Sequence, residues 1–600
     1  MIRDRLFLLG CVAVIAGTFA AKTSFGAETS ERNIGERIED LTFKDIRFLP
    51  RTLDDFSKKK AFVIICANTT CPLVQRYLPT IKRLEKEYRR RDVQFLLMNV
   101  SPGDSFLEMS EFGVQYEIDF PVVKDGDGSC VRALGMTRTP EVAVLDADHR
   151  LRYRGRINDQ YRIGGALPKA TREYLTEALD AVLDGKPVAK TQTPVDGCLI
   201  TPAATNEADG SITFAEHIEP IIRKHCAECH RDGTEAPFSL TNYDEVAAQG
   251  EMVAEVVADG RMPPRYASHR FTEFYNLRGL SSRERRLILG WVGSNMPRGE
   301  YGKDGAPPPV EPSTGGWSIG KPDMVLTMKE THQLPADGYI DYKYVTLPYV
   351  FTKDTWVQAI QILPDNARVV HHCNLLSLPE DGNWRQSAFI TGKVPGSQPL
   401  SLGDGVAQRL PAHSVLAMQI HYTSTGKPEK SQISVGFRFA RGKVKKEFRH
   451  ILVKSTDFEI PPGANNHRVT SSMTLDRATH GFGLFTHMHL RGKDMTYLAH
   501  YPDGKSETLL IVPNYNFDWQ MGYRWKPHTK RFPKGTRFEV VAHFDNSAFN
   551  PFNPDPKDTV REGQQTYHEM MYGFYFYTHA DENLDLSIDP KTGHVAQSTN

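Results

Sequence analysis

Residues 61–74, AFVIICANTTCPLV, lead from a continuous apolar run into a cysteine followed by a proline. The first seven of them predict a strand that is buried on both faces of a sheet. Apolar side chains recur at helical spacing over residues 72–90, and residues 93–100 form a second apolar run. Two further apolar segments, 142–145 and 151–156, flank a polar turn and predict a hairpin. Strand, helix, strand and hairpin together indicate an α/β domain with a mixed sheet.

The length and composition of the chain indicate several folded domains. Its 600 residues exceed what one hydrophobic core supports, and two polar linkers that contain proline, 187–211 and 297–316, divide it into three blocks. Lysine plus arginine equal aspartate plus glutamate at 73 each, with no long run of one charge, so we expect no nucleic-acid partner. The eight unevenly spaced cysteines are too few for a disulfide-based scaffold.

The N-terminus has the anatomy of a secretory signal. A short basic stretch precedes an apolar segment, 6–20, which is shorter than the roughly 20 residues that span a bilayer. We expect a signal peptide over 1–27, cleaved near Ala20 or near 26–27; a lipoprotein signal at Cys11 and a buried N-terminal helix are the alternatives. No later segment is long and apolar enough to be a membrane helix. We therefore expect an exported protein of the periplasm or cell envelope, without a membrane span in the mature chain.

The middle block carries the sequence CAECH at residues 226–230. In a C-x-x-C-H motif two thiols, here Cys226 and Cys229, add to the vinyl groups of a haem, and His230 becomes an axial iron ligand. An apolar stripe at helical spacing runs into the motif, so we expect the motif to lie on a helix. A zinc site is the alternative, but it requires a second cysteine pair that this block lacks.

Residues 212–300 resemble class I-like cytochrome c domains, which implies an all-α domain over 205–300 with covalently bound haem c. In that family a methionine of a G-x-M-P-P segment is the second axial ligand, and Met262 in GRMPP matches it; Met296 is the alternative. A Met/His ligand pair raises the iron potential, which suits an electron carrier. The structural alternative for Met262 is a core methionine before a proline turn.

The last block consists of short apolar runs separated by Pro, Gly and Asp turns. Examples are WVQAIQILP at 356–364, SVLAMQIHY at 414–422 and GFGLFTHMHL at 481–490. Such runs at near-regular spacing predict an all-β sandwich, and about 280 residues are enough for two sandwiches.

Candidate metal ligands lie in these runs, although a single histidine on a strand is more often packed or exposed than bound to a metal. The candidates are His371, His372, His421, His487, His489 and Met570. Because residues i and i+2 of a strand share a face, His487 and His489 can hold one metal. The adjacent His371 and His372 can converge only at a strand end or a bulge, with His421 as the third ligand. Two imidazoles and the Met570 thioether favour a copper that cycles through Cu(I).

Residues 340–580 resemble the type II copper, ascorbate-dependent monooxygenases, the family of peptidylglycine α-hydroxylating monooxygenase and dopamine β-monooxygenase. The HH…LL, Q-x-HY, H-x-H-x-x-G and E-M segments carry the resemblance. It implies two jelly-roll-like β-sandwich lobes, 317–455 and 456–590, with one copper ion each. Two features depart from the family: Cys373 is the only cysteine here, whereas the relatives have disulfides, and Met571 leaves the methionine assignment open by one residue.

The same resemblance implies a division of labour between the two copper sites. The site formed by His371, His372 and His421 passes an electron. The site formed by His487, His489 and Met570 binds O₂, and the activated oxygen abstracts hydrogen from a substrate C–H bond, with ascorbate as the reductant of the family.

Residues 30–185 resemble the redoxin branch of thioredoxin-like proteins, which implies a thioredoxin-like domain over 28–190. The match consists of Cys71-Pro-Leu-Val74 at a helix start, Pro79, and Thr139-Pro140 before a strand, with Pro140 as the expected cis-proline. A cysteine at a helix N-terminus has a lowered pKa, which activates its thiolate as a nucleophile.

This segment also departs from the redoxin pattern. Val74 stands where disulfide exchange places a second cysteine, so a partner for Cys71 must come from elsewhere. Asn68 replaces the threonine that peroxiredoxins have three residues before the cysteine. The cysteines available as partners are Cys66, Cys130 and Cys198. A purely structural or docking role for the domain is the alternative.

The leading hypothesis is an exported copper monooxygenase that hydroxylates a C–H bond of a small molecule or peptide with O₂. Its electrons come from an upstream donor through the tethered haem, in place of or besides ascorbate, because a tethered donor has a high effective concentration. Two other functions compete with it: a non-catalytic electron-transfer or copper-handling envelope protein, and a thiol peroxidase or disulfide reductase that acts through Cys71.

Overall fold

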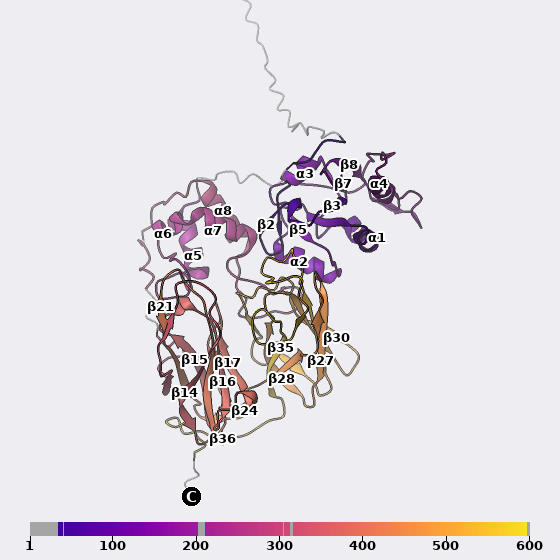
Figure 1. Ribbon diagram of the computed structural model, residues 1–600. Helices are drawn as coiled ribbons and strands as arrows, with labels where there is room; N and C mark the ends of the chain where they lie inside the picture. Colours follow the sequence, from indigo (N-terminus) through magenta and orange to yellow (C-terminus); the bar gives the residue numbers. More distant parts are fainter. Residues whose placement is uncertain (1–33, 40, 202–210, 304, 312–315, 597–600) are drawn as a thin grey trace, which may run out of the picture.

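Four blocks follow one another in the computed structural model (Figure 1). An α/β block lies at the upper right, a helical block at the upper left, and two β blocks below them. The predicted signal peptide, 1–27, lies outside the described residues, and the helices among the described residues are too short or too polar to cross a membrane. The residues that the structure describes are 34–39, 41–201, 211–303, 305–311 and 316–596.

The α/β block is built on a seven-stranded mixed sheet in the order β2-β1-β5-β4-β3-β7-β8. Strand β3 runs parallel to β4 and antiparallel to β7, so the predicted strands, helix and hairpin are confirmed as β3, α1, β4 and β7–β8. The elements are β1 Phe43–Asp45, β2 Pro50–Arg51, β3 Ala61–Ala67, α1 Pro72–Arg89, β4 Val93–Asn99, α2 Phe106–Gln115, β5 Val122–Lys124, α3 Ser129–Leu134, β6 Arg138–Thr139, β7 Val142–Asp146, β8 Leu151–Gly155, β9 Tyr161–Arg162, β10 Gly165–Ala166, α4 Tyr174–Leu183 and β11 Cys198–Leu199.

Strand β3 is buried on both faces, as its unbroken apolar sequence predicts. Its alternate side chains Ala61, Val63 and Ile65 pack with α1 and α4 in one core. The side chains between them, including Ile64 and Cys66, pack in a second core with α3. The central strand therefore has a hydrophobic layer on each side, which is the arrangement of an α/β fold with helices on both faces.

The helical block packs around Trp291, which is fully buried. Its last helix starts with the predicted capping box: the Ser281 hydroxyl accepts from the Glu284 N–H, and the Glu284 carboxylate accepts from the Ser281 N–H. The helices are a π-helical turn at Phe214–Ile218, α5 Glu219–His225, α6 Tyr243–Ala248, α7 Gly250–Asp259 and α8 Ser282–Gly293.

The CAECH motif does not lie on a helix as predicted, but directly after one. Helix α5 ends at His225, because the Ala227 N–H bonds the Ile222 carbonyl five residues back and breaks the helical pattern. The N–H groups of Cys229 and His230 then both bond the Cys226 carbonyl. The motif therefore forms a compact turn at the end of the apolar stripe.

The first β block is a sandwich of two sheets whose inner faces share one hydrophobic core. One sheet has the order β12-β22-β15-β19-β24, with β18 beside β15, and the other has the order β14-β20-β16-β17. The strands are β12 Met324–Thr327, β14 Lys343–Phe351, β15 Thr355–Pro364, β16 Val370–Pro379, β17 Ala388–Lys393, β18 Leu400–Ser401, β19 Val406–Leu410, β20 Ser414–Tyr422, β22 Ile433–Phe439 and β24 Lys446–Glu447.

The second β block is also a two-sheet sandwich, with the orders β25-β35-β28-β31, joined by β32, and β27-β33-β29-β30. Strand β25 pairs with β35 over its whole length, so this block begins near Arg449 and not at the predicted boundary of 456. The strands are β25 Arg449–Ser455, β27 His467–Thr474, β28 Thr479–His487, β29 Gly492–His500, β30 Ser506–Val512, β31 Gly522–Arg524, β32 Lys530–Phe532, β33 Arg537–Phe544 and β35 Met571–His579.

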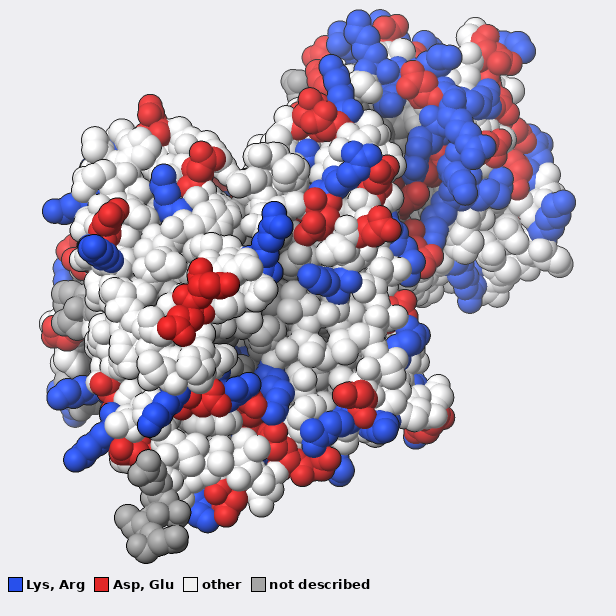
Figure 2. Space-filling model, turned by 60° about the horizontal axis from the view of Figure 1, so that its bottom comes forward, with Lys and Arg blue, Asp and Glu red and all other residues white. Residues whose placement is uncertain are grey.

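The α/β block and the helical block both pack against the second β block. Arg47 of the α/β block forms an ion pair with Asp545 at 3.1 Å, and the Phe56 ring stacks on Phe549 at 4.8 Å. The segment between α7 and α8 contributes Tyr266 and Phe274 to the core of the second β block. Figure 2 shows charged side chains crowded over the α/β block, at the upper right, and more uncharged surface over the β blocks.

Candidate functional site

The sulfur atoms of Cys71 and Cys198 lie 3.4 Å apart. Cys71 is the N-cap residue of α1, as predicted, and Cys198 lies on the short strand β11 in the linker that follows the α/β block. Strand β11 pairs with β6, which places Cys198 opposite Thr139. The Thr139–Pro140 peptide bond is cis, as the redoxin resemblance implies. Of the three cysteines available as partners for Cys71, the fold brings Cys198 to it.

The pKa values of the two thiols are shifted in opposite directions. Burial alone would raise the pKa of Cys71, but hydrogen bonds from Thr139 and from the Val74 N–H at the start of α1 outweigh burial and lower it. The Cys198 thiol adds a further hydrogen bond that lowers it. The pKa of Cys198 is raised, first by partial burial and then by the neighbouring Cys71. Cys71 is therefore the thiol of the pair that ionises first, and a thiolate is the form of cysteine that can act as a nucleophile.

The other two cysteines of the α/β block are core residues. Cys66 is fully buried and contacts the Met136 sulfur at 3.6 Å, and burial raises its pKa. Cys130 is buried in the same core, its thiol donates to the Thr42 carbonyl, and burial raises its pKa too. Neither is suited to act as a thiolate.

The CAECH turn holds its histidine by one ring nitrogen. His230 Nδ1 lies 3.1 Å from the Phe238 carbonyl oxygen, which fixes the ring and leaves Nε2 for an axial bond. Burial lowers the pKa of His230, which keeps the imidazole neutral, the state in which it binds a metal. Arg278 Nη1 lies 3.1 Å from Cys229 Sγ. The residues of this turn therefore fit a covalently attached haem.

The two candidate methionines occupy different environments. Met296 packs against the helical core, as Cys226 also does, and a side chain at Gly250 would collide with its sulfur. Met262 is half-buried, lies just after α7, and is outside that core cluster. The choice between Met262 and Met296 as axial ligand stays open.

His371, His372 and His421 form a cluster in which one ligand atom of each lies within 4.8 Å of the others. The pairing of β16 with β20 shifts register between Val370 and His372, so His371 sits at a bulge, the geometry that two adjacent converging histidines require. Nδ1 of His371 lies 3.2 Å from Nδ1 of His372, and Nδ1 of His421 is buried without a hydrogen-bond partner.

Burial keeps two histidines of this cluster neutral. It lowers the pKa of His372 well below the ordinary value and that of His421 to about 4, and the neighbouring histidines lower both further. Three clustered imidazoles, one of them with an unpaired buried nitrogen, fit a metal ion. Nitrogen ligands of this kind suit copper as well as zinc.

The second candidate set is His487, His489 and Met570. Strand β28 ends at His487, so His489 lies past the strand end and not on it as predicted, although the two rings still lie 5.1 Å apart. His487 Nδ1 lies 2.6 Å from Gln520 Oε1, and His489 Nδ1 lies 3.2 Å from the His568 carbonyl oxygen. Both Nε2 atoms are thereby left for a metal.

The two adjacent methionines differ in burial. Met571 begins β35 and is fully buried in the hydrophobic core, whereas Met570 precedes the strand and is half-buried. Met570 is therefore the methionine whose thioether is free of the core. The preceding Glu569 accepts from the backbone N–H groups of His489 and Arg491, and burial raises its pKa to about 8.

Three residues around the histidine sets were not found from the sequence. Gln520 holds His487, Glu569 holds the backbone of His489, and the Phe517 ring lies among the histidines. Gln520 and Phe517 belong to the aromatic and amide-rich stretch PNYNFDWQM, 513–521. That composition between two strands was the available signal, but no spacing rule connects it to His487, 33 residues away, or to the more distant His371.

The helical block contacts β17, which belongs to the sheet that carries the first histidine set. Lys393, the last residue of β17, pairs with Glu235, which lies five residues after His230. Lys393 is also the strand partner of Cys373, the residue after His372. The Glu235–Lys393 ion pair and the pairing of β17 with β16 therefore connect the haem-attachment turn to the first histidine set.

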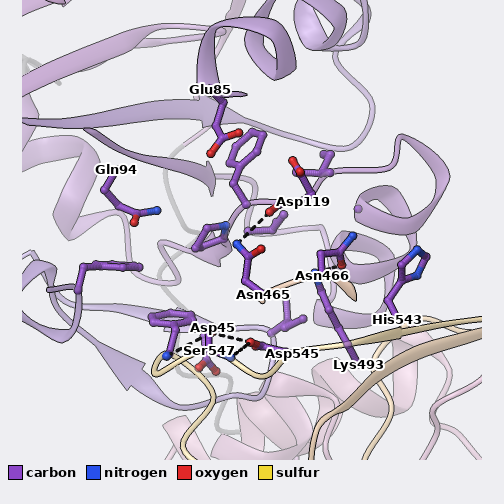
Figure 3. Close-up of a pocket in the computed structure, with 18 of the residues that line it drawn as sticks. Asp45, Glu85, Gln94, Asp119, Asn465, Asn466, Lys493, His543, Asp545 and Ser547 are labelled. Carbon is purple, nitrogen blue, oxygen red and sulfur yellow. Dashed lines mark hydrogen bonds between the residues drawn. The ribbon is translucent and has the colours of Figure 1, made fainter. Parts of the chain in front are cut away.

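A cavity of about 340 Å³ lies elsewhere, between the α/β block and the second β block (Figure 3). Its walls come from the end of α1, at Glu85 and Arg89, and from Lys493 and Asn465 of the second β block. Asn465 Nδ2 donates to the Asp119 carbonyl across it at 3.1 Å. It contains none of the predicted site residues, so we assign it to the contact between the two blocks.

Comparison with known proteins identifies the α/β block. A family model described as Redoxin matches residues 35–166. Thiol-disulfide oxidoreductase ResA of Geobacillus thermodenitrificans (strain NG80-2) is 23% identical over 152 residues, 25% of this chain and 84% of the relative. ResA of Halalkalibacterium halodurans is 24% identical over 142 residues, 24% of this chain and 78% of the relative.

Solved structures also match this part of the chain. A hypothetical protein from Sinorhizobium meliloti 1021 is 28% identical, with 29% of this chain and 96% of that chain covered and a TM-score of 0.27. On the family match, residues 35–166 are a redoxin domain with a thioredoxin-like fold, so that part of the prediction is confirmed.

Proposed function

We propose that the redoxin domain exchanges thiols and disulfides through Cys71 and Cys198. The observation that carries this proposal is the 3.4 Å separation of the two sulfur atoms. A disulfide bond is about 2 Å long, so closing it takes a shift of about 1 Å, which a two-residue strand in a linker can accommodate. The matching relatives are named thiol-disulfide oxidoreductases, which supports the same chemistry here.

The proposed exchange has two steps. The Cys71 thiolate attacks one sulfur of a substrate disulfide, a mixed disulfide forms, and the other substrate sulfur leaves as a thiolate. Cys198 then loses its proton to solvent and attacks Cys71 Sγ, which releases the second substrate thiolate and leaves a Cys71–Cys198 disulfide. The substrate gains two electrons and the cysteine pair loses them. An external dithiol reductant returns the pair to the reduced state.

Turnover of a peptide disulfide by the full-length protein, with a dithiol as reductant, tests this proposal. We expect Cys71→Ser to lower the rate by at least about 100-fold, because serine supplies no thiolate. Without the dithiol, Cys198→Ser should stop the reaction after one step and accumulate a mixed disulfide on Cys71, visible by mass spectrometry. The control is Cys130→Ala, which removes a buried thiol of the same domain. Equal activity in the wild type and Cys71→Ser would contradict the proposal.

We propose as a second function that the two β blocks form a copper monooxygenase that acts on a C–H bond of a small molecule or peptide. The observation that favours it is the pair of ligand sets: Nδ1 atoms converge in the first, and both Nε2 atoms are left free in the second. The soft Met570 thioether supports copper over zinc at the second set. When bound, copper ions at the two sets supply electron transfer and O₂ activation.

The residues of this chain then have separate tasks. His372 and His421 present neutral nitrogens, because burial lowers the pKa values of both, and His371 lies beside them. Gln520 and the His568 carbonyl orient His487 and His489. The surrounding aromatic and aliphatic side chains exclude water from these groups.

The proposal extends to the helical block and to the location of the protein. Cys226, Cys229 and His230 hold a haem that supplies electrons, and the Glu235–Lys393 ion pair keeps the block against the sheet of the first histidine set. An upstream donor, or ascorbate, provides the electrons. The N-terminal signal predicted over 1–27 supports export to the periplasm or cell envelope, where covalent haem attachment takes place and thiol exchange has substrates.

Metal and haem analysis of the purified protein tests the second function. We expect two copper ions and one covalent haem per chain, and O₂ uptake that depends on both copper and a C–H substrate. His421→Ala should lower the copper content to one per chain, whereas His413→Ala, an exposed histidine of the same block, should not change it. A protein that binds two coppers but consumes no O₂ with any C–H substrate would instead be an electron-transfer or copper-handling protein.

A further inference from the structure

One segment of the second β block, Pro513–Met521, contacts both histidine sets. We propose that this segment, here called the bridging segment, fixes the separation of the two metal sites, with Phe517 as the ring between them. The inference rests on the copper function proposed above. It assigns a positioning role to three residues, Phe517, Asp518 and Gln520, in a stretch of four.

Phe517 lies within ring-packing distance of four of the candidate histidine ligands. Its ring stacks on His371 with a centroid distance of 5.5 Å and an interplanar angle of 25°. The centroids of His372 and His421 each lie 6.3 Å from it, and that of His489, from the other set, lies 6.0 Å from it. These distances fall in the range of favourable aromatic contacts. A single phenyl ring therefore separates the first set from the second.

The neighbours of Phe517 each face one histidine of a different set. Gln520 Oε1 lies 2.6 Å from His487 Nδ1 in the second set. Asp518 Oδ1 lies 3.4 Å from His371 Nε2 in the first set, an ion-pair contact and not a hydrogen bond. Side chains that hold the non-ligating nitrogen of a metal-bound histidine orient the ring and raise metal affinity. One short segment thus places a polar side chain against a histidine of each set, although the sets lie in different β blocks.

The bridging segment is itself held firmly. The Tyr515 hydroxyl donates to the Met488 carbonyl at 2.7 Å and accepts from the Met488 N–H at 3.1 Å, so it is tied to the residue between His487 and His489. Trp519 packs against the first β block, where a side chain added at Gly396 would lie 3.2 Å from its ring. The segment is therefore hydrogen-bonded to the second β block and packed against the first, so it can hold the two blocks at a fixed distance.

Pulsed EPR on the full-length protein with Cu(II) at both sites tests this inference. The wild type should give one narrow distribution of copper–copper dipolar coupling. In Phe517→Ala we expect a broadened or shifted distribution with both coppers still bound, and in Phe517→Tyr, which keeps the ring, the wild-type distribution. Phe552→Ala, which removes an exposed phenyl group of the same block, is the matched control. An unchanged distribution in Phe517→Ala with two coppers bound would overturn the inference.

Copper affinity provides a second readout. Gln520→Leu should weaken binding at the second site by 10- to 100-fold, on the order seen when such outer partners are removed, and leave the first site unchanged. Asp518→Asn should affect the first site alone, and by less, because its carboxylate is exposed and its contact is longer. Loss of affinity at neither site would contradict the positioning role. A wild-type protein that binds no copper would instead refute the copper function itself, and metal analysis shows this before any EPR measurement.

Discussion

The thiol pair and the histidine sets differ in how far apart in the sequence their parts lie. Cys71 owes its environment to the helix that begins at the next residue and to two distant residues, Thr139 and Cys198. Each histidine set lies within one sandwich, and Phe517 of the second sandwich contacts histidines of both sets. The thiol pair is centred on one helix start, whereas the two histidine sets come together only when the two β blocks have docked.

The two centres also lie apart in space. Cys71 is at the beginning of α1, whereas the residues at its other end, Glu85 and Arg89, line the contact with the second β block. A helix of 18 residues is about 27 Å long. The thiol pair therefore lies at the end of α1 that is opposite this contact, and we expect the two centres to work independently.

The largest expected effect is a reciprocal loss of function in two single variants. Cys71→Ser should abolish thiol–disulfide exchange, a loss of at least about 100-fold, and leave the copper content at two per chain. His421→Ala should remove one copper and leave thiol exchange within about twofold of the wild type, because no shared group connects the sites. Both activities are measured on each variant. Loss of both functions in either folded variant would contradict the independence of the thiol pair and the histidine sets.

Tyr515→Phe should destabilise the second β block and leave the redoxin domain unchanged. The hydroxyl serves both the N–H and the carbonyl of buried Met488, so its removal leaves two buried backbone groups unpaired, at a cost of about 2 kcal/mol. Urea denaturation followed by tryptophan fluorescence measures the loss. Tyr567→Phe, an exposed tyrosine in the same block, serves as the control. Equal stability of the two variants would show that the segment is not anchored by this hydroxyl.

The next effect concerns the pH dependence of Cys71 alkylation. Because the pKa of Cys71 is lowered and thiolate is the reactive form, its alkylation rate should rise with pH and level off below the pH at which an ordinary cysteine does. Cys198→Ala removes one of the hydrogen bonds that lower this pKa, so the midpoint should move upward. Mass spectrometry of the Cys71 peptide gives the rate at each pH. A midpoint at or above the ordinary value in the wild type would be inconsistent with this environment.

The smallest expected effect concerns Asn68. Its side-chain oxygen accepts from the Cys71 N–H at 2.6 Å and from the Thr70 N–H at 3.2 Å, so Asn68→Ala should cost about 1 kcal/mol. Asn68→Asp keeps the acceptor and should retain most of the stability. Thermal denaturation compares the two, and copper content should be the same in both. An Asn68→Ala protein as stable as the wild type would mean that other contacts define this turn.

The sequence predicted the redoxin domain well because its signals are local. The apolar run of β3, the helical spacing of α1 and the cysteine at the helix start each lie within about 20 residues. The two β sandwiches were also predicted from a local signal, the short apolar runs separated by Pro, Gly and Asp turns. The block boundary was wrong by about one strand, because β25 has no feature of its own that shows which sheet it will join.

The remaining features depend on distant pairings. Cys198 could not be chosen over Cys66 and Cys130 before β11 was seen to pair with β6. The bulge at His371 was required by two adjacent histidines, but the position of His489 past the end of β28 was not expected. Phe517 and Asp518 reach the first histidine set through docking of the two β blocks, and Gln520 reaches His487 within the second block, and no local pattern encodes these contacts.

The disulfide state of Cys71 tests the central claim most directly. The full-length protein is equilibrated in oxidising and then in reducing glutathione buffer, trapped with an alkylating reagent, digested and mapped by mass spectrometry. We expect a peptide pair joined by Cys71 and Cys198 in the oxidised sample, and both cysteines alkylated in the reduced one. A Cys71 that stays free under oxidising conditions, or pairs with a cysteine other than Cys198, would contradict the account.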